Sequence, residues 1–522
     1  SASAGKIVFD NDEYQFDGPI NIRKNDIDID LSGSTIYFGG ASSGFIFGDT
    51  RTDAIIDFRR CSIHSGTITN VDFHDIVNRN YITFNSIDIG SAYDLSISYV
   101  SNGGILVQGA SEDIALRDIE INDSGYYTTN RAIWISGALA SDYAGQLVDT
   151  STIERNATPF SVIKPNNIRI NNVNITYGAS TTEAGSYGIY LMNTDNVTIS
   201  NCDIDIGSTS TARCISVNNH SPNTKIIGCT LKANNTSTGI LVTQASDNVI
   251  ISNNIFLGDR IGGRDIYVQY LGKATISDNI FDTGSNTKIL VDFGGSADIV
   301  DNIIKSTSFV SGEVGVRVHS ILATGASALG GTATEVSEIS VRGNTFRNLV
   351  NPVTVNQDTS TTGSNVVGIK SLAVENNTAY NMDETSGGKA MVNATSLSAS
   401  NKLNIIMNSN KAYPRSVASL GNLLEDAAGF AVIERTDFQR LDDGITFRGK
   451  TGELVYEEGT WTPSTGGTGV MANAEGTYTK IGNIVHCFGG FTVTTNFNST
   501  TISGLPFPLG VTNNSASSFI AI

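Results

Sequence analysis

Two aspartates, Asp203 and Asp205, stand two positions apart in the stretch "NCDIDIG" (201–207). The alternating apolar residues around them predict a short strand, on which the two carboxylates share the outward face at a Cα separation of about 6.5–7 Å. Glycoside hydrolysis uses two carboxyl groups, about 5–5.5 Å apart in retaining enzymes and about 6.5–9.5 Å apart in inverting ones. The pair therefore indicates acid–base chemistry on a glycosidic bond. The alternative is a solvated acidic surface.

The pattern around this pair repeats along the chain. Residues 196–207 have near-copies at 167–178, 223–234, 247–258 and 273–284, each with short alternating strands. Strands this short cannot bury a face alone, but they can when stacked in parallel about 4.8 Å apart. The repeat predicts an all-β fold, a right-handed parallel β-helix of about thirteen coils. A β-sandwich of short strands is the alternative.

A buried position recurs at one corner of each expected coil and serves as a register mark. It is asparagine in the later coils, from Asn254 to Asn410, which predicts a ladder of side-chain amide hydrogen bonds. In the early coils we place the mark at Cys61, Ile87 and Ile119.

The register predicts which carboxylates stack beside the aspartate pair. It places Asp88, Glu120 and Asn174 next to Asp203 on neighbouring coils. Carboxylates held this close raise one another's pKa, as a general acid requires. Glu120 is therefore a further catalytic candidate.

Two more glutamates lie in expected loops. Glu183 is flanked by small residues in the corner loop 177–188, close to an aromatic residue and two arginines. Glu154 lies in an insertion at about 138–166, which would wall a cleft. Long loops on a rigid scaffold commonly carry function, so both are catalytic candidates.

Each expected coil has a second strand, and in several coils an aromatic residue lies on its outward face, with arginines and a further tyrosine in the adjoining corner loops. Aromatic rings stack on sugar rings, and this predicts a sugar-binding platform. A subunit contact is the alternative. The substrate-binding candidates are Arg131, Trp134, Tyr187, Tyr190, Arg213 and Tyr267.

Composition excludes several classes of function. The net charge of −18 argues against nucleic acid and against anionic membranes. No apolar run is long enough to span a bilayer. The histidines show no zinc spacing, and no phosphate-binding loop is present, so we expect neither metal nor cofactor. The five cysteines are too few and too scattered for a disulfide framework, which favours folding in a reducing cytoplasm.

The expected organisation has four parts. Residues 1–20 form a leading segment, 21–415 the β-helix, 416–452 a connector, and 453–522 a small antiparallel β domain for trimerisation or carbohydrate contact, expected to be cut short at its end.

The β-helix, followed by "EEGTWTP", "GTYTKIGNIV" and "ISGLPFP", resembles bacteriophage tailspike and tail-fibre proteins; the opening residues 6–38 resemble the start of their pectate-lyase-like β-helices. The resemblance implies a homotrimer in the virion tail, attached to other tail proteins through a preceding N-terminal segment. It also implies an enzyme that depolymerises bacterial capsule or O-antigen outside the host cell. The family has no universal catalytic motif, so no site residue is carried over.

Three functions remain open. The first is an endo-glycosidase that uses the carboxylates. The second is a polysaccharide lyase, in which Arg131, Arg169 or Arg213 neutralises a uronic acid. The third is an adhesin that binds a glycan without cleaving it.

Overall fold

A computed structural model shows two compact units, Ser1–Gln439 and Arg440–Ile522. The structure describes residues 5–39, 44–48, 58–70, 80–98, 103–124, 131–137, 164–177, 187–207, 212–234, 237–243, 246–258, 263–269, 272–292, 294–307, 313–320, 337–357, 369–382, 390–396, 403–414, 422–425, 431–433, 456–465, 471–481, 484–493 and 502–503.

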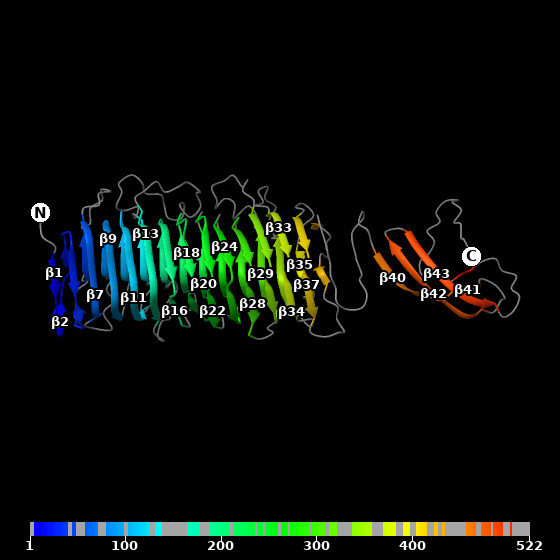
Figure 1. The fold of residues 1–522 in the computed structure, drawn as a ribbon, viewed down its shortest axis with the longest axis horizontal. Coiled ribbons are helices and arrows are strands. Elements are labelled where there is room, and N and C mark those ends of the chain that lie inside the picture. Colours follow the sequence, from blue (N-terminus) through cyan, green and yellow to red (C-terminus); the bar gives the residue numbers. More distant parts are fainter. Residues whose placement is uncertain are drawn as a thin grey trace. The chain divides into compact units, whose positions relative to one another are not determined.

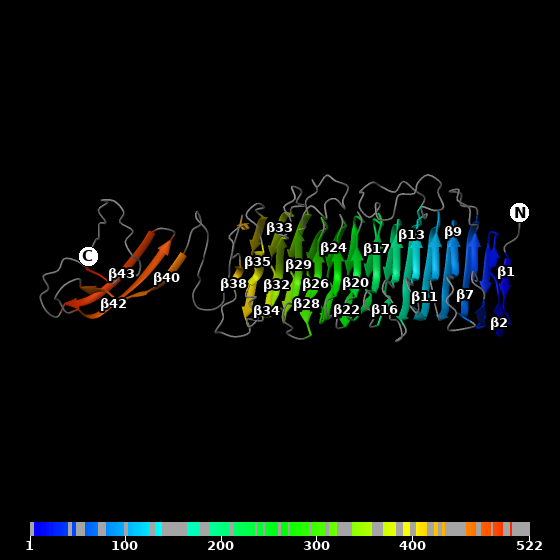
Figure 2. The ribbon, with the colours of Figure 1, turned by 180° about the vertical axis from the view of Figure 1, so that it is seen from behind.

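Two parallel sheets build the first unit, and their strands stack along one axis from β1 to β39 (Figures 1 and 2). Sheet B contributes one strand per coil: β3 (Ile20–Ile22), β6 (Phe45–Gly48), β8 (Asn80–Asn85), β10 (Gly103–Gln108), β12 (Arg131–Ser136), β14 (Tyr187–Met192), β17 (Arg213–Asn218), β20 (Thr238–Val242), β23 (Arg264–Val268), β26 (Thr287–Val291), β29 (Val314–Ser320), β32 (Asn351–Gln357), β35 (Ala390–Ser396) and β38 (Asn422–Glu425).

Sheet A contributes two strand segments per coil. In four coils one long strand runs through both segments: β7 (Phe58–Asn70), β9 (Ile87–Ser98), β11 (Glu112–Ser124) and β13 (Asn166–Tyr177). The remaining strands of sheet A are β1 (Gly5–Val8), β2 (Glu13–Phe16), β4 (Ile27–Asp30), β5 (Thr35–Phe38), β15 (Asp195–Ser200), β16 (Asp203–Asp205), β18 (Lys225–Ile227), β19 (Thr230–Lys232), β21 (Val249–Ser252), β22 (Ile255–Gly258), β24 (Lys273–Ser277), β25 (Ile280–Thr283), β27 (Ser296–Val300), β28 (Ile303–Ser306), β30 (Ser337–Arg342), β31 (Thr345–Arg347), β33 (Ile369–Glu375), β34 (Thr378–Met382), β36 (Leu403–Asn408), β37 (Lys411–Pro414) and β39 (Ala431–Ile433).

At the corner between the two segments of sheet A, one residue in each coil adopts a left-handed backbone conformation. Only glycine, asparagine and aspartate enter this region at low cost, which explains the recurring Asn and Asp. We call these residues the corner column; their φ angles lie between 54° and 68°, and they are Ser65, Asp94, Asp118, Asn172, Asn201, Gly228, Asn253, Asp278, Asp301, Gly343, Asn376 and Ser409. The segment before the corner forms the first face of the β-helix, the segment after it the second face, and sheet B the third.

The asparagine ladder is confirmed directly after the corner column. The Asn302 carboxamide oxygen accepts hydrogen bonds from the backbone and side-chain amides of Asn279, both at 2.9 Å. Its amide nitrogen donates to Asn344 Oδ1 and to the Ile276 carbonyl, both at 2.9 Å. The same pattern runs from Asn254 to Asn410, and these side chains are at most 2% exposed. Each coil is thereby held in register with the next.

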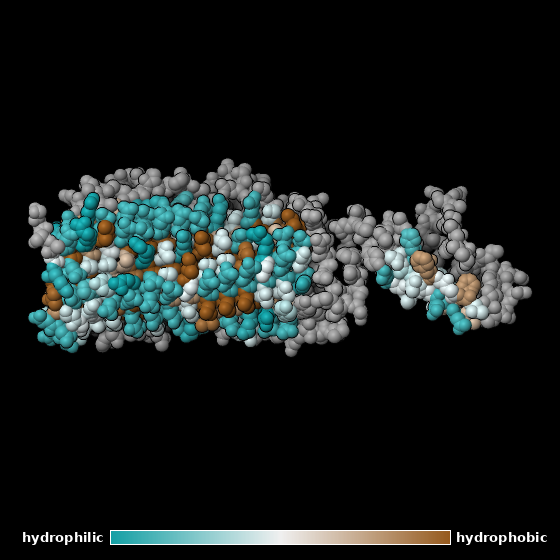
Figure 3. Space-filling view, viewed as in Figure 1, coloured by the Kyte–Doolittle hydropathy of each residue, from teal (hydrophilic) through white to brown (hydrophobic). Residues whose placement is uncertain are grey.

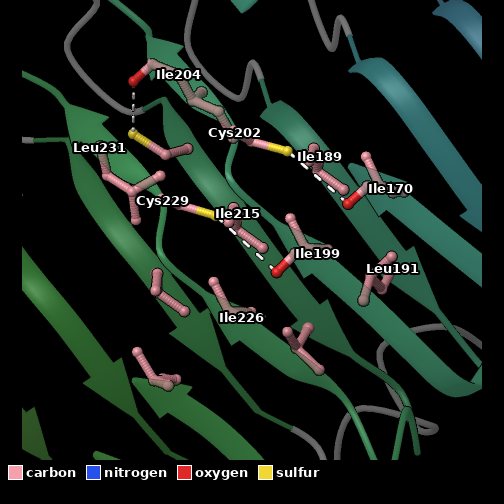
Figure 4. Close-up of a cluster of buried hydrophobic side chains, with 14 of the residues drawn as sticks. Ile170, Ile189, Leu191, Ile199, Cys202, Ile204, Ile215, Ile226, Cys229 and Leu231 are labelled. Carbon is pink, nitrogen blue, oxygen red and sulfur yellow. Dashed lines mark hydrogen bonds between the residues drawn. The ribbon is translucent and has the colours of Figure 1, made fainter. Parts of the chain in front are cut away.

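The core is a continuous stack of isoleucine, valine, leucine and phenylalanine between the sheets. Cys202 and Cys229 occupy ladder positions before the asparagines begin and lie among Ile189, Ile204 and Ile215 (Figure 4). Four of the five free cysteines are buried, so they act as small core residues.

The expected register is wrong in two early coils. Ile119 pairs with Leu95, not Ile87, and Leu95 pairs with Gly66, not Cys61. The reason is that β7 and β9 run through the corner without a break, so the apolar alternation of the first face looks like that of the second. Asp88 consequently pairs with Glu112 on the first face, away from Glu120.

The strand ladders extend beyond the boundaries expected for the β-helix. β1 and β2 already pair with β4 and β5, within the expected leading segment. β38 and β39 continue sheets B and A past residue 415, into the expected connector. In the second unit β40 (Tyr456–Trp461), β42 (Met471–Ile481) and β43 (Ile484–Val493) form the expected antiparallel sheet, and β41 (Ser464–Thr465) pairs with β44 (Ile502–Ser503).

Replacing Asn302 by alanine should destabilise the β-helix by about 2–4 kcal/mol. The variant loses several buried hydrogen bonds and leaves the Asn279 N–H without its acceptor. Urea denaturation followed by circular dichroism measures the loss. Asn21→Ala, on an exposed position of β3, is the control and should change the midpoint little. Equal midpoints for the two variants would contradict a structural role for the ladder.

Candidate functional site

The aspartate pair lies on the second face as expected. β16 is three residues long, with Ile204 fully buried between the outward Asp203 and Asp205. On the preceding coils Asn174 pairs with Asp203, and Glu120 pairs with Asn174. Glu120 and Asp203 therefore share one column, two coils apart, or about 9.6 Å at Cα.

The two aspartates have different electrostatic surroundings. Lys232, on the next coil, forms an ion pair with Asp205. Partial burial, and then the charge of Asp205, raise the pKa of Asp203, while Lys232 opposes this shift. Asp203 is thus a carboxyl group with a raised pKa, and Asp205 is the one paired with a cation.

Glu120 lines an open groove of about 750 Å³ at the corner between the first and second faces. Asp94 and Asp118 of the corner column line it as well. The pKa of Asp118 is lowered by hydrogen bonds from Asn172 and Arg117. The sequence analysis did not identify these two aspartates as site residues. The recurrence of Asp and Asn at the left-handed position could have done so, because it marks residues whose side chains point outward.

The aromatic residues and arginines expected to bind sugar meet on the third face. The Arg131 guanidinium lies 4.1 Å from the Trp134 ring centroid and 4.8 Å from that of Tyr190. The rings of Tyr187 and Tyr190 pack edge to face at 4.6 Å, and Arg213 donates a hydrogen bond to the Tyr187 hydroxyl at 2.7 Å. These five residues form what we call the aromatic–arginine cluster.

The cluster combines partial burial with unused donors. Burial raises the pKa of Tyr190. Within the described part of the chain, Trp134 Nε1 and Arg131 Nε are buried and have no hydrogen-bond partner. A ligand that accepts hydrogen bonds would satisfy such groups.

Tyr267 does not join the cluster. It lies in the same column as Trp134 and Tyr190 but three coils beyond Tyr190, and its hydroxyl donates to Asp292 at 3.3 Å. Arg169 is exposed on the first face and is also separate from the cluster.

The aspartate pair and the cluster flank the same edge of the β-helix. β16 ends the second face and β17, which begins with Arg213, starts the third. Cys214 Sγ lies 3.8 Å from the Ile204 carbonyl, and the Tyr177 hydroxyl donates to the Tyr187 carbonyl. A polymer lying along this edge would therefore have carboxylates on one side and aromatic rings on the other.

Glu183 and Glu154 lie outside the described residues. Within the described residues no group of three or more His, Cys, Asp or Glu side chains is arranged to hold a metal ion. No helix among them is long and apolar enough to cross a membrane.

Farther along the axis, one column of side chains on the second face becomes apolar. Ile255, Ile280 and Ile303 continue the Asp203 column and are 39%, 40% and 44% exposed. Apolar residues interrupt the hydrophilic surface of the β-helix in Figure 3.

Comparison with known proteins confirms the fold and its handedness. A family profile described as a right handed beta helix region matches residues 103–269 and 166–346. A mutant tailspike protein of E. coli bacteriophage HK620 is 11% identical, with a TM-score of 0.50 over 94% of this chain and 85% of that one. The tailspike of Pseudomonas phage phi297 is 13% identical, with a TM-score of 0.45 over 80% and 65%. A mannuronan C-5 epimerase module of Azotobacter vinelandii is 12% identical, with a TM-score of 0.40 over 77% and 91%. No curated protein matches significantly by sequence.

The packing of Arg131 on Trp134 is testable by fluorescence. The chain has two tryptophans, so Trp461→Phe leaves Trp134 as the sole reporter. Adding Arg131→Ala should shift the emission to longer wavelength and increase quenching by acrylamide, because the ring loses its cover. Arg264→Ala, which uncovers Tyr267 instead, is the matched control. Unchanged emission in the Arg131 variant would show that the guanidinium does not cover the ring.

Proposed function

We propose that this chain is a phage tailspike that recognises bacterial capsule or O-antigen and depolymerises it by endo-glycosidic hydrolysis. The observation that carries the proposal is the edge shared by the Asp203–Asp205 pair and the aromatic–arginine cluster. The right-handed β-helix and the residues "EEGTWTP" and "ISGLPFP" in the second unit support the assignment to phage tails.

The carboxylates have complementary roles in this mechanism. Asp203, whose pKa is raised, is the general acid that protonates the leaving glycosidic oxygen. Asp205 accepts a proton from the attacking water, and its spacing along the strand suits an inverting reaction. Glu120 is the alternative base, because it faces the same direction two coils away. Glu183 and Glu154 remain candidates on sequence grounds.

The aromatic–arginine cluster binds the polymer in this proposal. Trp134, Tyr187 and Tyr190 offer ring faces and edges to sugar rings, while the arginines offer donors to hydroxyl or carboxylate groups. Tyr267 extends the surface along the axis. The arginines also favour a second candidate function, a lyase that acts on uronic acids, in which Arg131 or Arg213 neutralises the carboxylate.

The proposed assembly is a homotrimer in the virion tail. The exposed isoleucine column of Ile255, Ile280 and Ile303 supports packing between subunits, because a row of apolar side chains gains free energy when it is buried. This contact would lie beyond the aspartate pair along the axis and leave the edge beside Arg213 open.

Asp203→Asn should reduce depolymerisation at least 100-fold and leave glycan binding intact, because the amide cannot donate the catalytic proton. Size-exclusion chromatography of purified capsules and O-antigens, before and after incubation, measures the chain length. Asp282→Asn is the matched control, since Asp282 pairs with Lys305 in the same column as Asp205 and Lys232. Full activity in the Asp203 variant would exclude Asp203 as the general acid. If the wild-type protein binds a polysaccharide without shortening it, the protein is an adhesin.

Lys232→Met should move the alkaline limb of the pH–activity profile to higher pH. Lys232 holds down the pKa of Asp203, so its removal raises that pKa. A general acid is active while protonated, and activity therefore persists to higher pH in the variant. Initial rates across a pH series give the profile. A shift to lower pH would contradict Asp203 as the acid.

A further inference from the structure

The outward face of sheet B differs in charge from the rest of the protein. The chain carries a net charge of −18, yet the nine strands of sheet B from β10 to β32 contain one acidic residue, Asp265, which is fully buried in the interior. Asp292, just after β26, is 5% exposed. Four arginines lie on this face: Arg131, Arg213, Arg264 and Arg317.

The arginines are regularly spaced along the axis. Arg131, Arg213 and Arg264 occupy one column, and each is separated from the next by one intervening coil. Arg317 follows two coils later in the adjacent column. The interval is about 9.6 Å, which is twice the strand separation. An extended polysaccharide with a charged sugar in each disaccharide presents its charges at a comparable, regular interval.

Within the described residues no carboxylate forms an ion pair with these four arginines. Arg264 lies 4.6 Å from the Tyr267 ring centroid, and Arg317 Nε is buried without a partner. Burial and the charge of Arg264 lower the pKa of Arg317. Clustered, partly desolvated guanidinium groups are stabilised by a bound anion.

Aromatic rings accompany three of these coils on the same face, β12, β14 and β23. Trp134 and Tyr190 occupy adjacent coils beside Arg131, and Tyr267 lies beside Arg264. The face thus offers both stacking surfaces for sugar rings and paired donors for carboxylates.

We propose that the outward face of sheet B, from β12 to β29, is a binding track for an acidic polysaccharide lying along the axis. Carboxylates of its uronic or other acidic sugars meet Arg131, Arg213 and Arg264 on alternate coils, and sugar rings stack on Trp134, Tyr190 and Tyr267 where the polymer passes them. This inference rests on the proposed function, because it names the chemical class of the polysaccharide that the protein would cleave.

The test is binding of purified bacterial polysaccharides, acidic and neutral, to the full chain carrying Trp461→Phe, with Trp134 emission as the readout. The polysaccharides that bind should be acidic, and their affinity for the protein should fall as the salt concentration rises. Reducing the uronic carboxyls of a bound polysaccharide to alcohols should weaken binding at least ten-fold. Arg213→Gln and Arg264→Gln should each weaken it at least five-fold. Arg342→Gln, on sheet A and paired with Asp298, is the control.

Three results would contradict the proposed binding track. They are binding that survives reduction of the carboxyl groups, binding of neutral polysaccharides only, and binding of none of the acidic polysaccharides. The result is separable from the proposed hydrolysis. Cleavage of a neutral polysaccharide would support the proposed hydrolysis and contradict the proposed track for an acidic polymer. Binding of an acidic polysaccharide without cleavage would keep the track and reject the hydrolase.

Discussion

The whole β-helix depends on one backbone conformation, repeated once per coil: the left-handed corner residue of sheet A. This residue turns the strand from the first face to the second without a loop, as Asp118 does in β11. The next side chain then points inward, where asparagines from Asn254 onward bond to one another. Local backbone preference and buried hydrogen bonds thus select the same register, and consistency of this kind favours a single fold.

Register has a functional consequence, because it turns sequence spacing into columns of neighbouring side chains. Asp203, Asn174 and Glu120 become neighbours on the second face although they are far apart in sequence. The same rule aligns Trp134 with Tyr190 on the third face. An acidic protein can in this way carry a basic, aromatic surface on one face and carboxylates on the next.

The sequence predicted the repeated part of this structure well and its irregular part less well. The third-face column from Trp134 to Tyr267 and the asparagine ladder were read correctly, because alternation and Asn fix them unambiguously. The register failed at Ile87, where one strand crosses two faces and both show the same alternation. The sequence did not predict the ion pair of Asp205 with Lys232, because that contact depends on how side chains of two neighbouring coils are oriented.

We propose that the polymer is cleaved by hydrolysis at the edge between the second and third faces. The most direct measurement is mass spectrometry of the oligosaccharides released from a polysaccharide that the protein shortens. The account predicts products with new reducing ends, each heavier by one water than the sum of its linked residues, and without the ultraviolet absorbance of an unsaturated uronate. Products that lack this water and absorb as unsaturated uronates would show elimination instead and contradict the carboxylate mechanism.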